Sequence, residues 1–200
     1  AGFPDTVIVA SNDLDEYLIR DLKMQGARVD LWGVGTKLIT SADGPALGGV
    51  YKMSAIEDDG VLEPRIKRSD NPAKMTLPGR KAVHRLYDEE GMAVADLITL
   101  AEEAIDTIRP LTIFDPNETW KRMTLTNFSA VPLLKPLFRL GKPVGDPPTL
   151  AEIGQHRIKE ESTFWDQYLR VMNPHEFKVD LSDKLWQMRN DLLSRNGHSA

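Results

Sequence analysis

VIVASNDLDEYLIRDLKMQGARVDLWGVGTKLIT, residues 7–40, carries the strongest fold signal in the chain. Residues 7–10 are a short apolar run of mostly β-branched side chains, which predicts a strand. Apolar residues then recur at helical spacing between Leu14 and Leu22, and Gly26 is placed to end that helix. A second apolar run at residues 29–32 predicts another strand. The stretch therefore indicates a strand–helix–strand unit, and because such a unit alone has unpaired sheet edges, we expect it to expose apolar surface.

Each predicted strand ends in a loop of small polar residues and glycine. Ser11, Asn12 and Asp13 follow the first strand and are suited to capping the helix that begins there. The second strand runs into Gly33-Val34-Gly35-Thr36. Such loops place backbone N–H groups at a helix start, where the local dipole favours an anion. In an eight-stranded α/β barrel, the loops after the last two strands commonly bind phosphate. The pattern thus indicates a phosphate site, although a plain strand-to-helix turn has the same pattern.

Three segments of this region are similar to the nicotinate phosphoribosyltransferase family: ASNDLDEYLI (10–19), WGVGTKLIT (32–40) and PALGGVYKM (45–53). Two later segments resemble later blocks of the same family, in the same order: NPAKMTLPGRKAVHRLYD (71–88) and NPHEFKVDLSDKLW (173–186). The resemblance covers essentially the whole chain and is to the C-terminal portion of the family. It implies an α/β fold: the last two strand–helix units of an irregular type II phosphoribosyltransferase α/β barrel, followed by antiparallel β segments and a helical C-terminal tail.

The resemblance also implies an activity and a set of phosphate contacts. The family forms nicotinate mononucleotide and pyrophosphate from nicotinate and phosphoribosyl pyrophosphate, with coupled ATP hydrolysis, in NAD biosynthesis. In the family, the loop that matches Gly33, Gly35 and Thr36 holds the 5-phosphate, and Ser11 and Asn12 match positions near the ribose phosphate. Mg²⁺ and ATP are implied as cofactors, but no motif in this chain binds either one.

No catalytic residue is expected in this chain. The family transfers a phosphoryl group from ATP to a histidine, and none of the four histidines here lies in the matching context: His84, His156, His175 and His198. That histidine, the tyrosine that contacts nicotinate and an Asp-Ser-Gly-Asp segment all lie upstream in the family. We therefore assign no metal ligand either. The 200 residues alone are expected to be inactive without the N-terminal portion of the same enzyme. The resemblance implies that the intact enzyme is a homodimer.

Two other functions are compatible with the sequence. The chain could be an inactive remnant or a separate subunit that binds phosphoribosyl groups or a partner chain only. A related enzyme that uses nicotinamide is a further option, but its second glycine loop is richer in glycine than WGVGTK at residues 32–37. The gene segment upstream of Ala1 separates the first of these options from the enzyme.

Composition excludes several classes of partner. Lys and Arg number 25 against 30 Asp and Glu, which gives a net charge of −5, and the two signs are interspersed. This balance argues against nucleic acid or an anionic membrane as the partner. There is no cysteine, and no apolar run approaches membrane-spanning length, so a cytoplasmic location is expected.

The sequence divides into three predicted regions. Residues 1–44 are the C-terminal part of the barrel, residues 45–100 are antiparallel β, and residues 101–200 are mostly helical. In the second region, side chains alternate from Val50 to Ile56 and Asp58-Asp59-Gly60 predicts a turn. Another hairpin is predicted from residues 81–87 and 92–98, separated by a Glu90-Gly91 turn. The run Arg80, Lys81 and Arg85 is interpreted as a solvated basic face, with contact to a nucleotide phosphate as a minor alternative.

In the third region, two helix starts are visible. Thr149 and Glu152 form a capping-box pattern. The helix that follows is expected to present one broad apolar face and to end at Pro174, with the face made by Leu150, Ile153, Phe164, Trp165, Tyr168 and Met172. Ser182 is expected to cap a last helix that buries Leu185, Met188 and Leu192.

Overall fold

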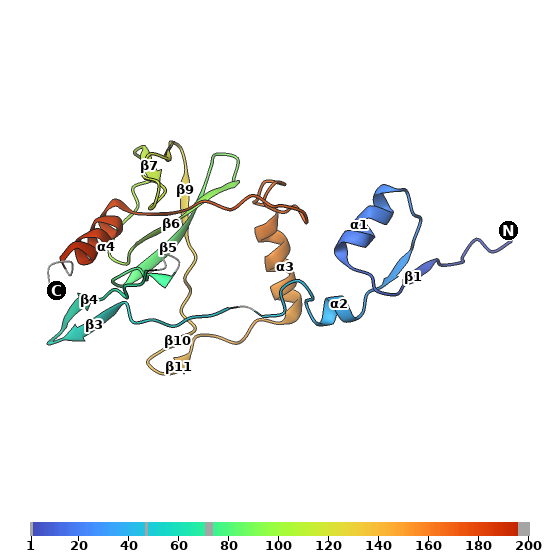
Figure 1. Cartoon of the computed structure of the whole chain (residues 1–200), viewed down its shortest axis with the longest axis horizontal. Helices are drawn as coiled ribbons and strands as arrows, with labels where there is room; N and C mark the ends of the chain where they lie inside the picture. Colours follow the sequence, from blue (N-terminus) through green and yellow to red (C-terminus); the bar gives the residue numbers. More distant parts are fainter. Residues whose placement is uncertain (1, 47, 71–73, 196–200) are drawn as a thin grey trace. The chain divides into compact units, whose positions relative to one another are not determined.

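The computed structural model describes residues 2–46, 48–70 and 74–195, and it divides the chain into two units (Figure 1). The first unit is Ala1–Tyr51 and the second is Lys52–Ala200. Together they form a mixed α/β protein with several small sheets and few helices. In the described ranges, no helix combines the length and the apolar character needed to cross a bilayer.

The first unit has the predicted strand–helix–strand order. It contains β1 (Val9–Ser11), α1 (Glu16–Met24), β2 (Leu31–Gly33) and a short α2 (Thr36–Ile39), coloured blue in Figure 1. Strands β1 and β2 pair in parallel, from Val9 opposite Leu31 to Ser11 opposite Gly33. The prediction that these two strands are adjacent and parallel, with a helix between them, is confirmed.

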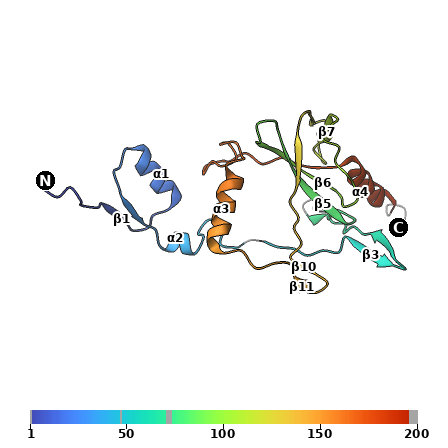
Figure 2. The ribbon, with the colours of Figure 1, turned by 180° about the vertical axis from the view of Figure 1, so that it is seen from behind.

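Figure 2 shows α1 from behind. Its two ends are formed in different ways. At the C-terminal end, Gly26 has φ +82° and donates from its N–H to the Lys23 carbonyl at 3.0 Å. The next residue donates to the Leu22 carbonyl, which completes a Schellman motif that only a residue tolerant of positive φ can form.

The N-terminal end of α1 differs from the prediction. The cap is Asp15, whose side chain accepts from the Leu18 N–H at 2.8 Å. Ser11, Asn12 and Asp13 do not cap the helix. Instead Asn12 and Asp13 have φ +85° and +48°, so they form the turn that takes the chain from β1 to α1. Asn and Asp tolerate this left-handed conformation better than most residues, which explains their presence here.

The first unit exposes much of its apolar surface. Among residues 2–46 and 48–51, only Leu14 is buried. Ile8, directly before β1, and the strand residues Val9 and Leu31 are each more than half exposed. The expectation of exposed apolar surface on the strands is confirmed. A two-stranded sheet with one helix packed on it is too small to bury both of its faces.

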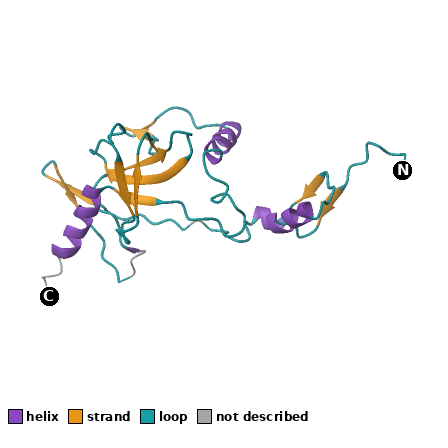
Figure 3. Ribbon diagram, turned by 90° about the horizontal axis from the view of Figure 1, so that it is seen from above, coloured by secondary structure: helices purple, strands orange, loops and turns teal. Residues whose placement is uncertain are grey.

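The second unit is centred on a four-stranded sheet in the order β12-β6-β5-β9 (Figure 3). Strands β5 (Lys81–Tyr87) and β6 (Ala93–Leu100) form the predicted antiparallel hairpin. Strand β9 (Ser129–Pro132) is antiparallel to β5, and β12 (Val179–Leu181) is parallel to β6. The long sequence separation between β6 and β12 is the reason this parallel edge could not be predicted.

Alternation along β6 builds the core of this unit. One face of β6 packs against Leu86, Ile113 and Phe128 through Ala95 and Leu97. At the end of β6, a second cluster contains Leu100, Leu181 and Leu185.

The second cluster includes the last helix, α4 (Asp183–Arg195). As predicted, Ser182 caps this helix by accepting from the Leu185 N–H at 3.2 Å, and Leu185 is fully buried. Met188 and Leu192, also expected to be buried, are only partly buried.

Three smaller hairpins complete the second unit. Strands β3 (Ala55–Asp58) and β4 (Val61–Pro64) join at Asp59-Gly60, both with positive φ, so the predicted turn is confirmed although the first strand starts later than expected. The other hairpins pair β7 (Leu111–Phe114) with β8 (Arg122–Leu125), and β10 (Phe138–Arg139) with β11 (Lys142–Pro143).

The structure does not have a mostly helical region at residues 101–200. Strands β7 to β11 occupy residues 111–143, and the only helices there are α3 (Leu150–Glu161) and α4 among the described residues. Prolines are frequent between residues 132 and 148, and they remove the N–H donors that a helix needs. The capping box of α3 is confirmed, with Thr149 accepting from the Glu152 N–H.

Helix α3 is also shorter than predicted. It ends at Glu161, so Phe164, Tyr168 and Met172 lie outside it. Phe164 and Tyr168 instead pack edge-to-face against Phe177, with ring centroids 4.9 and 5.2 Å away. The apolar residues after residue 161 therefore belong to an aromatic cluster in a loop. Their residue types are also typical of the apolar face of a helix, which is why the sequence predicts a longer helix.

Candidate functional site

The loops that follow β1 and β2 leave the same edge of the small sheet. Ser11 at the end of β1 is the register partner of Gly33 at the end of β2. A Cβ atom placed on Gly33 would lie only 3.1 Å from the Ser11 Cβ. A glycine is therefore favoured here by close packing of the two strand ends, and the fold brings together two of the residues predicted to bind phosphate.

The phosphate loop, defined here as residues 33–36, presents a bare backbone. Gly35 precedes α2 and has φ −114°, and a Cβ at this position would have no neighbouring atom within 4 Å. Gly35 therefore does not have the positive φ that commonly requires a glycine. What the missing side chain does provide is open space around the backbone, which a ligand could approach.

Several polar groups around this loop have no partner within the described residues. This holds for the hydroxyls of Ser11 and Thr36 and for the amide of Asn12, all on exposed residues. The Thr36 carbonyl, in contrast, accepts from the Thr40 N–H at 2.9 Å and from the Thr40 hydroxyl at 2.7 Å. The three side chains are thus free to donate, and the backbone of Thr36 is held by the first turn of α2.

Helix α2 is too short to contribute a large dipole. It has four residues, so few peptide dipoles add along its axis. The expectation that a helix start would favour an anion is therefore weaker than the sequence suggests. Any anion contact at this loop depends on individual hydroxyl and backbone N–H donors, such as the Thr36 and Lys37 N–H groups, which have no backbone acceptor in the described part of the chain.

An ion pair that the sequence does not predict connects the two loops. Asp15 Oδ1 accepts from the Leu18 N–H, and Asp15 Oδ2 pairs with the Lys37 ammonium. The hydrogen bond from Lys37, together with the one from Leu18, lowers the pKa of Asp15. The same hydrogen bond raises the pKa of Lys37, so both groups are charged near neutral pH. The two residues are 22 positions apart, and only the fold brings them together.

A small pocket of about 150 Å³ lies beside this ion pair. Its charged lining is mainly acidic: Asp15, Glu16 and Asp43 against the single ammonium of Lys37. A hydrogen bond to Asp43 raises the pKa of Tyr17 in the same region. An acidic pocket repels phosphate, and none of the residues predicted to bind phosphate lines it.

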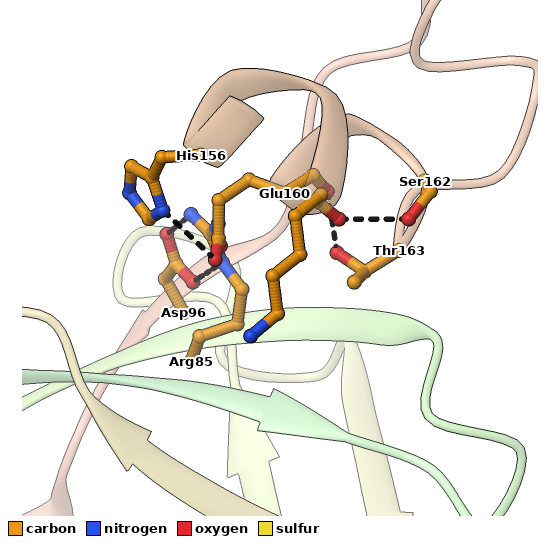
Figure 4. Close-up of polar contacts among 7 residues, drawn as sticks. Arg85, Asp96, His156, Glu160, Ser162 and Thr163 are labelled. Atoms are coloured by element: carbon orange, nitrogen blue, oxygen red, sulfur yellow. Dashed lines mark hydrogen bonds and ion pairs between the residues drawn. The ribbon is translucent and has the colours of Figure 1, made fainter. Parts of the chain in front are cut away.

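The basic run of the second unit is not a solvated face. Arg85 makes two hydrogen bonds to Asp96, at 2.8 and 3.0 Å, and lies 3.6 Å from Glu160 of α3 (Figure 4). Its guanidinium also lies 4.8 Å from the centre of the Phe164 ring. The hydrogen bond to Asp96 is the main cause of its raised pKa. Arg85 therefore joins α3 to the sheet, and Asp96 and Glu160 hold its side chain within the protein.

Lys81 is also engaged within the protein. Its ammonium donates to the carbonyl oxygens of Leu77 and Gly79, at 2.8 and 2.7 Å. Burial lowers its pKa. Of the three basic residues in the run, only Arg80 is exposed, so the solvated face is a wrong interpretation for Lys81 and Arg85.

The three described histidines have different surroundings. His84 lies on β5 with its Nδ1 buried and unpaired, and His156 lies on α3 with its Nδ1 3.8 Å from Glu160. His175 packs against Tyr168 with the ring centroids 6.3 Å apart, while His198 lies outside the described residues. Within the described ranges, no three His, Asp or Glu side chains are grouped so that they could hold a metal ion.

Comparison with known proteins gives one family. The sequence pattern described as "Nicotinate phosphoribosyltransferase C-terminal domain" matches residues 80–189. The chain is 44% identical over 187 residues to nicotinate phosphoribosyltransferase of Bacillus subtilis, covering 93% of this chain and 38% of that protein. It is 32% identical over 189 residues to the human protein of the same name, covering 94% of this chain and 34% of the relative.

A solved structure shows the same similarity. The crystal structure of human nicotinic acid phosphoribosyltransferase aligns with a TM-score of 0.71 at 27% identity. The alignment covers 94% of this chain and 33% of that chain. The chain thus spans about a third of the length of these relatives.

Proposed function

Because the chain belongs to the nicotinate phosphoribosyltransferase family, we propose that it serves as the C-terminal portion of an enzyme of NAD biosynthesis. The proposed reaction joins nicotinate to phosphoribosyl pyrophosphate, with coupled ATP hydrolysis, and releases nicotinate mononucleotide and pyrophosphate. The observation that carries the proposal is the family match over residues 80–189, supported by relatives of that name that align with more than nine-tenths of the chain.

The role that we propose for this chain is to hold the 5-phosphate of phosphoribosyl pyrophosphate. The proposed contacts are Ser11, Asn12, Gly33, Gly35 and Thr36. Their support is the geometry of the strand ends, where Ser11 and Gly33 are register partners and the hydroxyls have no partner among the described residues. The 5-phosphate does not react, so binding it fixes the sugar and positions the carbon at which the new bond forms.

We assign this chain no role in holding Mg²⁺ or in receiving a phosphoryl group from ATP. The described residues contain no group of three His, Asp or Glu side chains that could hold a metal ion, and in the family the histidine that receives the phosphoryl group lies upstream of the segments matched here. Both requirements of the family activity are therefore proposed to be met by residues outside the described ones.

The proposal also concerns the length and the oligomeric form of the active enzyme. Strands β1 and β2 supply two strands, whereas a closed α/β barrel needs about eight. We expect the 200 residues alone to be inactive, and the active enzyme to be a longer protein, working as a homodimer, in which further strands pair with this sheet.

The experiment is an assay of the natural protein that contains this chain. The purified protein is incubated with nicotinate, phosphoribosyl pyrophosphate, ATP and Mg²⁺, and nicotinate mononucleotide is quantified by chromatography. We expect product with nicotinate, more product when ATP is present, and little with nicotinamide. A protein that binds phosphoribosyl pyrophosphate but forms no mononucleotide would instead be a binding subunit, and a preference for nicotinamide would assign the related enzyme.

A further inference from the structure

We propose that Asp15 and Lys37 act as a positioning pair that holds the phosphate loop in place for phosphoribosyl pyrophosphate. This inference rests on the function proposed above. It concerns two residues that contact each other and are not themselves assigned to the ligand.

The connectivity of the pair supports this role. Asp15 closes the loop after β1 and caps α1 through the Leu18 N–H. Lys37 directly follows Thr36 on α2, and its ammonium pairs with the second carboxylate oxygen of Asp15. The ion pair therefore joins the loop that carries Ser11 and Asn12 to the loop that carries Gly35 and Thr36. The same Asp15 side chain also caps α1.

The burial of the pair also supports it. The Asp15 side chain is 16% exposed, although most of the first unit is open to solvent. An aspartate that is shielded and makes two hydrogen bonds has a fixed orientation, unlike the freely rotating pairs common on surfaces. The first unit has little buried apolar packing to hold its loops, so a polar link between them has more influence on their geometry.

The main alternative is that Lys37 binds the phosphate directly. The surroundings of the Lys37 ammonium disfavour this. Asp13 and Asp43 attract the ammonium as Asp15 does, and Lys37 lines an acidic pocket. A phosphate would have to approach through that acidic group of side chains to reach it.

Asp15→Asn and Lys37→Met isolate the ion pair in the natural full-length protein. Asparagine is as good a helix cap as aspartate, so Asp15→Asn removes the charge and keeps the cap. Methionine keeps the length and helix propensity of lysine. Lys37→Arg is the conservative variant that retains the pair. Glu63→Gln is the control, because Glu63 forms an ion pair with Arg65 in the second unit, and both of those side chains are exposed.

Each single variant is expected to raise the KM for phosphoribosyl pyrophosphate about two- to fivefold, the range for one ion pair partly open to solvent. The KM for nicotinate stays unchanged, and the double variant is no worse than either single one, because both remove the same interaction. Lys37→Arg restores the original value, and Glu63→Gln has no effect.

The other outcomes each overturn a different statement. If Lys37→Met is far more damaging than Asp15→Asn, and Asp15→Asn improves binding, Lys37 is a direct ligand and the positioning role is wrong. If the melting temperature falls while every KM is unchanged, the pair only stabilises the fold. If Thr36→Ala and Ser11→Ala also leave the KM for phosphoribosyl pyrophosphate unchanged, the proposed phosphate site itself is wrong.

Discussion

Thr36→Ala tests the proposed phosphate site most directly. The Thr36 hydroxyl is on an exposed residue and has no partner among the described residues, so its removal leaves no protein group unsatisfied. The free energy of unfolding should therefore change by less than about 0.5 kcal/mol. Binding is different, because a hydrogen bond to a charged group contributes about 1.5–3 kcal/mol. The affinity for phosphoribosyl pyrophosphate is expected to fall about ten- to hundredfold.

Steady-state kinetics on the natural full-length enzyme, with each substrate varied in turn, measures this change. The 5-phosphate is remote from the reacting carbon, so part of the loss should appear in kcat as well as in KM. Nicotinate binding should change little. Thr6→Ala is the matched control, because Thr6 is another exposed threonine of the first unit that lies outside both loops. Unchanged KM and kcat for phosphoribosyl pyrophosphate in Thr36→Ala would refute the assignment and leave residues 33–36 as a turn.

Three further substitutions test the second unit by chemical denaturation. Leu86→Ala removes a fully buried side chain from the main core and should lower the free energy of unfolding by about 2–5 kcal/mol, whereas a loss below about 1 kcal/mol would mean that Leu86 is not central to packing. Gly79→Ala should cost about 1–3 kcal/mol, because Gly79 has φ +78° and a Cβ there would lie 3.2 Å from Leu100 and 3.3 Å from Met188; a neutral result would exclude this backbone conformation. Asp115 has its pKa lowered by two backbone N–H groups, so its carboxylate stabilises the fold above the unfolded pKa of about 3.9, and this contribution is lost as the pH falls through the lowered value. Asp115→Asn keeps the turn geometry but cannot titrate, so its stability should approach that of the wild type below about pH 4, and parallel pH profiles would contradict this.

Local signals explain which elements could be predicted. The order strand, helix, strand in residues 9–33 follows from apolar spacing, and Gly26 ends the helix by its own conformational preference. The β5–β6 hairpin and the capping box at Thr149 are likewise contained within short stretches of sequence. Each of these elements depends on residues that are close along the chain.

The features that could not be predicted depend on distant contacts. Arg85 belongs to a run of basic residues that is typical of a surface, yet Asp96 and Glu160 satisfy it inside the fold. The sequence offers several polar residues that could cap α1, and the contact of Asp15 with Lys37, 22 positions away, is visible only in the fold. The prediction of helix for residues 101–148 is wrong for another reason. Apolar residues at mixed spacing are compatible with a helix, but here the pairing of β7 with β8 makes the chain extended.

The parallel edge strand β12 has a consequence for how the second unit acquires its structure. Ser182, directly after β12, donates a hydrogen bond to Glu103 across a separation of 79 residues, whereas β5 and β6 are joined by a short turn. Closing a long loop costs more chain entropy than closing a short one, so the hairpin should form early and β12 with α4 should join it late. Substitutions in β12 and α4 should then accelerate unfolding and leave the refolding rate nearly unchanged, whereas substitutions in the β5–β6 hairpin should slow refolding.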